Sequence, residues 1–192
     1  MILEPSLFFT APLESSNGYT WTLASRLGDM LHQAQEFFGQ RDKSYTILGV
    51  EFGTDNPRIW YPGNRKDVII QLSPSAAESM ARACYQLAHE TVHLLSPSGA
   101  NDANNFEEGI ACYFAALYMR IHFKGLLMQP EVPSYLHALA LVGPRLSTDI
   151  HCIQRLRSHE PCISRISRED LAAEFPDLTA SDVDFLASKF VR

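Results

Sequence analysis

Basic residues are too few in this chain to suggest a protein that binds nucleic acids or anionic membranes. Its 192 residues include 16 lysines and arginines against 22 aspartates and glutamates, which gives a formal net charge of −6 at pH 7. Both nucleic acids and anionic membranes favour partners with a basic surface patch. We therefore expect no nucleic acid and no membrane as partner, and we expect a small molecule, a peptide or a protein instead.

Long apolar runs are also missing, and the first residues do not show the pattern of a signal peptide. The apolar stretch at residues 7–9 is short, has no basic flank before it and follows Glu4 and Pro5. A secretory signal needs a basic flank and a longer apolar core, and a membrane-spanning helix needs about 20 apolar residues. We expect no signal peptide, no membrane span and a cytoplasmic location.

Cysteine is scarce, and its spacing is not that of a common metal or redox motif. The four cysteines contain no C-x-x-C pair and lie mostly inside apolar helical patterns, at Cys84, Cys112, Cys152 and Cys162. This pattern is typical of buried, reduced thiols in a cytoplasm, with disulfides as the alternative.

Repeats, low-complexity tracts and flexible linkers are absent as well. A chain of 192 residues with 46% hydrophobic residues is long enough to bury one good core and too short for two. We expect residues 1–192 to form a single domain.

Hydrophobic periodicity predicts an α+β fold in which the sheet comes first. An amphipathic helix at residues 20–39 ends at a glycine, and short segments rich in β-branched and aromatic residues follow at residues 45–52, 58–61 and 67–72. Helical patterns then continue at residues 75–95, 106–123, 134–142, 144–158, 168–175 and 181–190. The expected architecture is a small N-terminal β-sheet of three or four strands packed on a mostly helical C-terminal part.

The motif that carries chemistry lies in the helix predicted at residues 75–95. Residues 89–93 read His-Glu-Thr-Val-His, an H-E-x-x-H sequence. Residues four apart share one face of a helix, so His89 and His93 can bind one metal ion together. Glu90 is rotated by about 100° from His89, which favours a general base beside the metal over a ligand. A helix with a solvated His-Glu-His face is the alternative.

A catalytic zinc site usually has a third protein ligand, and the next predicted helix offers two. Glu107 and Glu108 lie in its first turn, fifteen residues or fewer after His93. Because each residue of a helix turns by about 100°, only one of the two can point toward the histidines. A solvated acidic first turn that complements the helix dipole is the alternative for both.

With this glutamate, the chain resembles the gluzincin zinc metallopeptidases, whose pattern is H-E-x-x-H, a spacer and a glutamate on the following helix. Aminopeptidase-like members often show Asn-Glu-Gly there, so the resemblance implies that Glu108, which precedes Gly109, is the ligand. Thermolysin-like members have an aspartate four residues later that orients a histidine. This position is Cys112 here, so we expect another group to orient the histidine.

The resemblance covers residues 68–119 and is closest to the small, stripped-down members with one sheet, a metal helix and a ligand helix. It implies that the strand before the metal helix binds the extended substrate along the cleft, through Val68, Ile69, Ile70 and Gln71. An ordinary core strand is the alternative for this segment. It also implies a Tyr or His that stabilises the oxyanion, for which we name Tyr113, with Tyr118, Tyr135, His137 and His151 as alternatives.

These observations predict a zinc-dependent peptidase that binds Zn2+ through His89, His93 and Glu108. Its substrate would be a peptide or protein, hydrolysed by metal-activated water with Glu90 as the general base. The alternative is a metal-stabilised binding or regulatory module that holds a partner in a zincin-like groove without cutting it. A fourth protein ligand would favour the second hypothesis, because closed zinc sites are structural.

Overall fold

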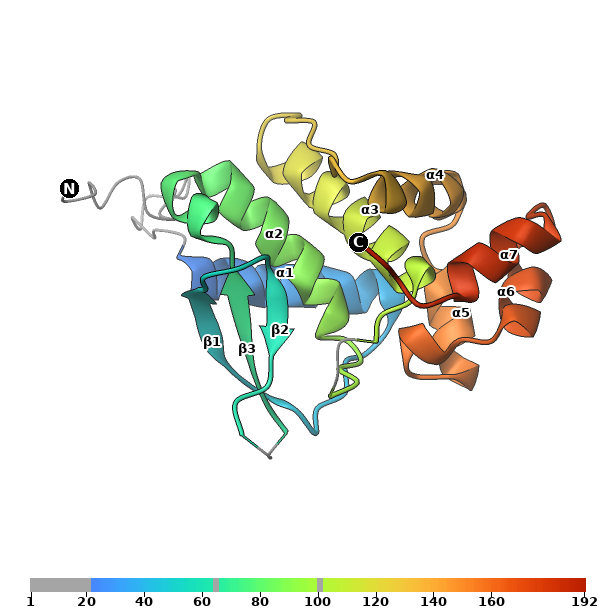
Figure 1. Ribbon diagram of the computed structural model, residues 1–192, viewed down its shortest axis with the longest axis horizontal. Coiled ribbons are helices and arrows are strands. Elements are labelled where there is room, and N and C mark those ends of the chain that lie inside the picture. Colours follow the sequence, from blue (N-terminus) through green and yellow to red (C-terminus); the bar gives the residue numbers. More distant parts are fainter. Residues whose placement is uncertain (1–21, 64–65, 100–101) are drawn as a thin grey trace.

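The α+β architecture predicted from the sequence is confirmed. A computed structural model describes residues 22–63, 66–99 and 102–192, so the apolar stretch at residues 7–9 lies outside the described residues. The described part contains a three-stranded sheet followed by a predominantly helical region (Figure 1). Its strands are β1 (Thr46–Phe52), β2 (Arg58–Trp60) and β3 (Asp67–Leu72); its α-helices are α1 (Leu23–Phe38), α2 (Met80–His93), α3 (Asn105–His122), α4 (Pro133–Thr148), α5 (Cys152–His159), α6 (Arg168–Glu174) and α7 (Ala180–Ala187).

The sheet has the order β1-β3-β2, with β3 in the middle. β3 pairs in parallel with β1 over its whole length and antiparallel with β2 from Ile69 to Gln71. Alternate residues of β3, namely Val68, Ile70 and Leu72, are fully buried, as the two-residue period of a strand requires when one face covers the core. The short strand β2 therefore forms one edge of the sheet.

The helices α1 and α2 lie next to the sheet, and α3 and α4 follow beyond α2 (Figure 1). α2 packs against α1 and contacts β2 and β3, and α3 lies between α2 and α4. α1 begins with a capping box in which Thr22 and Ser25 satisfy each other's backbone N–H groups. Its buried residues follow helical spacing, and its core-facing apolar side chains are Leu27, Met30, Ala34 and Phe38.

Two predicted helix boundaries are wrong. The helix expected at residues 75–95 is a 3-10 helix, η2 (Pro74–Glu78), followed by α2, because Ser79 accepts a hydrogen bond from the backbone N–H of Arg82 and caps a new helix. The break expected before Pro144 does not occur, and α4 runs through it. Proline lacks one backbone N–H, but packing of α4 on α3 holds the helix together across that missing bond.

Gly109 brings α3 and α4 unusually close. A Cβ at this position would lie 2.9 Å from the carbonyl oxygen of Ala138 and 2.9 Å from a methyl group of Val142, both on α4. Such distances leave no room for any side chain. The glycine after Glu108 therefore lets the second turn of α3 pack closely against the middle of α4, the helix whose Tyr135 lies against His89.

Arg157 joins the C-terminal helices to the rest of the molecule. Its buried guanidinium donates hydrogen bonds of 2.8–3.2 Å to the carbonyls of Phe38, Gly39, Gln40 and Leu95, and one of 3.1 Å to Pro161. The first four carbonyls follow the ends of α1 and α2, where helices leave backbone acceptors unpaired. One side chain of α5 thus satisfies two helix ends at once.

No helix within the described ranges is long and apolar enough to cross a membrane. The four cysteines are free thiols; three are buried and Cys162 is half-buried.

Candidate metal centre

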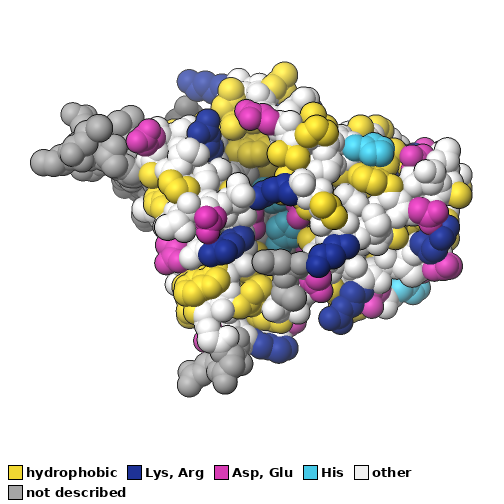
Figure 2. Space-filling model, viewed as in Figure 1, with side chains coloured by type: hydrophobic (Ala, Val, Ile, Leu, Met, Phe, Trp, Pro, Cys, Tyr) yellow, Lys and Arg dark blue, Asp and Glu magenta, His cyan; other side chains and the backbone are white. Residues whose placement is uncertain are grey.

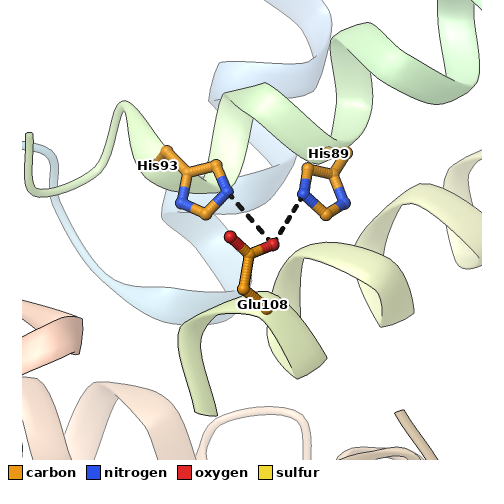
Figure 3. A group of neighbouring side chains, drawn as sticks. All are labelled: His89, His93 and Glu108. Carbon is orange, nitrogen blue, oxygen red and sulfur yellow. Dashed lines mark hydrogen bonds and ion pairs between the residues drawn. The ribbon is translucent and has the colours of Figure 1, made fainter. Parts of the chain in front are cut away.

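The candidate metal centre lies between α2 and α3. His89 and His93 are one turn apart near the end of α2, on the side that faces α3. α3 begins at a buried cap, Asn104, whose side-chain oxygen accepts a 2.9 Å hydrogen bond from the backbone N–H of Glu107. This cap fixes the rotation of the first turn, and Glu108 points from it toward both histidines (Figure 3).

His89, His93 and Glu108 bring one ligand atom each to a common point. Nε2 of His89 is 3.0 Å from Oε2 of Glu108, and Nε2 of His93 is 3.7 Å from the same oxygen. The three ligand atoms all lie within 4.8 Å of one another. Zinc bonds of about 2.0–2.1 Å in a tetrahedron place ligand atoms about 3.3 Å apart, so this group fits a metal ion.

Glu107 occupies a different position in the same cluster. Its Oε1 is 3.0 Å from Nδ1 of His93, the ring nitrogen that faces away from Glu108. A carboxylate in this place accepts the Nδ1–H bond and thereby aims Nε2 at the metal. Of the two neighbouring glutamates, Glu108 therefore belongs to the group that could hold a metal ion, and Glu107 contacts the far nitrogen of His93.

Cys112 stands behind the other histidine. Its Sγ lies 3.8 Å from Nδ1 of His89, one helical turn after Glu108 on α3. The sequence led us to expect that a group other than Cys112 would orient this histidine. The thiol is instead in contact with it, because residues 108 and 112 share one face of α3.

The acidic and imidazole groups perturb one another strongly. Burial alone would lower the pKa of His89, but hydrogen bonds with Cys112 and Glu108 raise it to about 10. Burial would also lower the pKa of His93, but the charges of Glu108 and Glu107 raise it well above its usual range. For Glu108, burial would raise the pKa, but the charge of His93 and hydrogen bonds from both rings lower it. A metal ion would replace the protons that the rings share with Glu108.

Glu90 is buried beside this group and reaches the same cleft. Burial raises the pKa of its carboxyl, and the charges of His93 and His89 oppose this rise. A carboxylate with a raised pKa is a better proton acceptor, as a general base requires.

The group lies in a cleft of about 520 Å³. Figure 2 shows a hollow near the middle of one face, with a histidine side chain visible inside it and acidic side chains beside it. One wall is formed by β2 and the residues before it, including Arg58 and Ile59, and another by Tyr135, Phe190 and Arg192. Walls of this kind can hold an extended chain between them.

The strand predicted to bind substrate lies elsewhere. Val68, Ile69, Ile70 and Gln71 belong to β3, which is the middle strand, and none of them lines the cleft. Both edges of β3 are paired from Ile69 to Gln71, so this segment has no free backbone for a peptide. The strand beside the cleft is β2.

Tyr61 and Tyr135 both line the cleft, and Tyr135 packs on a histidine of the metal group. Its ring packs edge-on against His89 at 5.7 Å between centroids, and it lines the cleft. Burial and the charge of Glu108 raise the pKa of its hydroxyl to about 12, so the hydroxyl keeps its proton at neutral pH. Tyr113 lies against α4, 3.8 Å from where a Cβ of Gly143 would be, and does not line the cleft.

The other oxyanion candidates lie away from the metal group. Tyr118 donates a hydrogen bond to Asp29, His137 stacks on Phe185, and His151 is the residue before α5, without a side-chain capping bond. The roles of Asn104, Glu107 and the residues after α7 were not predicted from the sequence. Only the Asn104 cap has a local signal, an asparagine three residues before an acidic first turn.

Comparison of the chain with protein-family models, with curated proteins and with solved structures finds no match. What the structure supports is a group of three side chains, His89, His93 and Glu108, that could hold a metal ion.

Proposed function

We propose that this protein is a zinc-dependent peptidase in which His89, His93 and Glu108 bind the metal. The observation that carries the proposal is that these three side chains converge in an open cleft with the carboxylate of Glu90 beside them. Two imidazoles and one carboxylate are a common ligand set of catalytic zinc. When bound there, zinc supplies Lewis-acid activation of water and of a peptide carbonyl.

Glu90 is the general base in this proposal. Its carboxylate would accept a proton from the attacking water and then donate it to the nitrogen of the leaving amine. Burial raises the pKa of this carboxyl, which makes the carboxylate a better acceptor for the proton of the water. Glu107 and Cys112 would keep the two imidazoles aimed at the metal while this happens.

Tyr135 replaces Tyr113 as the proposed oxyanion donor. It is protonated at neutral pH, lines the cleft and touches His89, so its hydroxyl can donate to the oxygen that gains charge. Tyr113 has no such support.

A peptide is the substrate class that the cleft walls favour. β2 is an edge strand, and its residues Arg58 and Ile59 line the cleft. The free backbone of an edge strand binds extended peptides by adding them as a further strand.

A metal-stabilised binding module is the second candidate. It would need a closed metal site, and the metal-binding group found among the described residues has three members rather than four. Three ligands leave a position for water, which favours catalysis.

The test compares wild-type protein with Glu90→Gln and, as a matched control, Glu169→Gln at an exposed position of α6. Zinc content is measured by elemental analysis and hydrolysis by mass spectrometry of a peptide library. We expect about one zinc in each protein, and hydrolysis reduced about 10²- to 10⁴-fold in Glu90→Gln alone. Unchanged hydrolysis in Glu90→Gln would disprove the role of Glu90, and bound zinc without any hydrolysis would favour the binding module.

A further inference from the structure

The residues after α7 run back into the cleft. In Figure 1 this dark red end of the chain passes along the beginning of α3 toward α2. It is anchored at Ser188, whose carbonyl accepts a 3.0 Å hydrogen bond from the backbone N–H of Asn105. The buried side chain of Asn105 donates two more, to the carbonyl and the hydroxyl of Ser188. The anchor and the metal-binding Glu108 therefore belong to the same turn region of α3.

Beyond the anchor, the chain pairs like a strand with the backbone before α3. Lys189 forms an antiparallel bridge with Asn104, and the N–H of Phe190 donates a 2.9 Å hydrogen bond to the carbonyl of Ala103. The side chains then alternate, since Phe190 and Arg192 line the cleft while Val191 is 75% exposed. This alternation is that of an extended chain laid along an edge.

The two side chains that face the cleft, those of Phe190 and Arg192, both contact Tyr135. The rings of Phe190 and Tyr135 are 4.4 Å apart between centroids, at 39°. Arg192 donates a 3.0 Å hydrogen bond to the hydroxyl of Tyr135, and its guanidinium lies 5.6 Å above the same ring. An aromatic side chain and a cation, two residues apart, thus share one tyrosine next to His89.

The charges of the cleft also favour a basic occupant. Five carboxylates line it, from Asp55, Glu90, Asp102, Glu107 and Glu108, and they outnumber the basic side chains, which are Arg58, Arg192, His89 and His93. Arg192 itself comes from the segment that occupies the cleft. A cationic peptide would be drawn to the remaining negative charge.

We propose that Ala103, Asn104 and Tyr135 form a peptide-binding subsite for an extended chain with an aromatic residue followed, two positions later, by a basic one. Residues 189–192 occupy this subsite as an intramolecular competitor that an incoming peptide must displace. The inference rests on the proposed function only in treating the cleft as a peptide-binding one, and binding without hydrolysis tests it. A tethered segment competes at an effective concentration of about 1 mM, so free peptides bind weakly until it is loosened.

The test uses the full chain with Phe190→Ala and Arg192→Ala combined, and Val191→Ala as the matched control on the exposed side of the same segment. The probe is a fluorescein-labelled peptide, Lys-Phe-Val-Arg, followed by fluorescence anisotropy in the presence of a chelator, so that metal-dependent hydrolysis does not interfere. We expect the double variant to bind the probe about tenfold more tightly than wild type or Val191→Ala. A probe with alanine in place of phenylalanine should bind about tenfold more weakly.

A second measurement uses the wild-type protein, so its result does not depend on whether the double variant folds correctly. Excess unlabelled Lys-Phe-Val-Arg should speed amide hydrogen exchange in residues 188–192 of wild type. Equal binding by the double variant and wild type, equal binding of the two probes, or unchanged exchange would overturn the subsite. Failure of hydrolysis alone would overturn the proposed function and leave the subsite standing.

Discussion

Each imidazole of the candidate metal centre is held from two sides. Nε2 of both rings faces Glu108, while Nδ1 of His93 faces Glu107 and Nδ1 of His89 faces Cys112. Groups that hold the far nitrogen of a histidine fix the ring orientation and raise its basicity. Glu107 and Cys112 can therefore be mutated to test how the rings are oriented, without changing the metal ligands themselves.

Glu107→Ala should lower zinc affinity about 10- to 100-fold, because Nδ1 of His93 loses its acceptor. Glu107→Gln keeps an acceptor oxygen and should lose less. Competition with a chromophoric chelator measures both. Glu108→Ala is the reference, and its zinc affinity should fall further than that of either Glu107 variant, because this change removes a ligand. A larger loss of zinc affinity in Glu107→Ala than in Glu108→Ala would mean that Glu107 is the ligand instead.

Cys112→Ala should lower zinc affinity by less than tenfold, because a thiol at 3.8 Å is a weak partner for an imidazole. Cys84→Ala, another buried thiol, on α2, controls for the loss of volume. The same chelator competition applies. If both variants bind zinc alike, the contact between Cys112 and His89 has no part in orienting the ring.

The sequence could predict the local part of this site but not its orientation. His89, Glu90 and His93 follow from spacing within one helix, since four residues make about one turn. The choice between Glu107 and Glu108 depends on how α3 is rotated toward α2, which the buried Asn104 cap and tertiary packing decide. Tyr135 becomes a neighbour of His89 only through the packing of α4, so no spacing rule singled it out.

At the scale of elements, the close contact of α3 and α4 at Gly109 holds the cleft wall in place. Gly109→Ala would force a methyl group against the Ala138 carbonyl and should lower the free energy of unfolding by about 1–3 kcal/mol. Chemical denaturation measures this. Gly28→Ala in α1 is the control: nothing lies within 4 Å of its Cβ position, so it should stabilise the protein by about 0.5–1 kcal/mol. Equal effects of the two changes would contradict the packing argument.

Helices and strands were predicted well where local sequence features determine them, and poorly where tertiary packing or strand pairing determines them. Caps and periodicity locate α1, α3 and the three strands to within a few residues. A helix break was wrongly predicted before Pro144, because tertiary packing allows α4 to continue through this residue. The prediction that β3 lines the cleft and binds substrate does not agree with its position in the middle of the sheet. The order β1-β3-β2 is set by long-range pairing. The sequence pattern of a single strand does not show whether the strand lies at an edge or in the middle.

At the scale of the whole molecule, the site links two helices of the core, so metal binding should stabilise the fold. Zinc at 100 times its dissociation constant contributes about 2.7 kcal/mol. For a chain of this length this should raise Tm by about 5–10 °C. Thermal unfolding followed by circular dichroism, with zinc and with a chelator, checks this. His93→Ala is the control and should show almost no shift; an equal shift would mean that zinc binds elsewhere.

Arg157 determines how the molecule comes apart. Its guanidinium connects α5 to the ends of α1 and α2, so detachment of α5 would leave the carbonyls of Phe38, Gly39, Gln40 and Leu95 without this donor. A buried acceptor left unpaired costs about 1–3 kcal/mol, which opposes local opening of α5 while α1 and α2 stay folded. We therefore expect α5 to unfold together with α1 and α2. Zinc bound to α2 and α3 should then slow amide hydrogen exchange in α5, although α5 does not line the cleft.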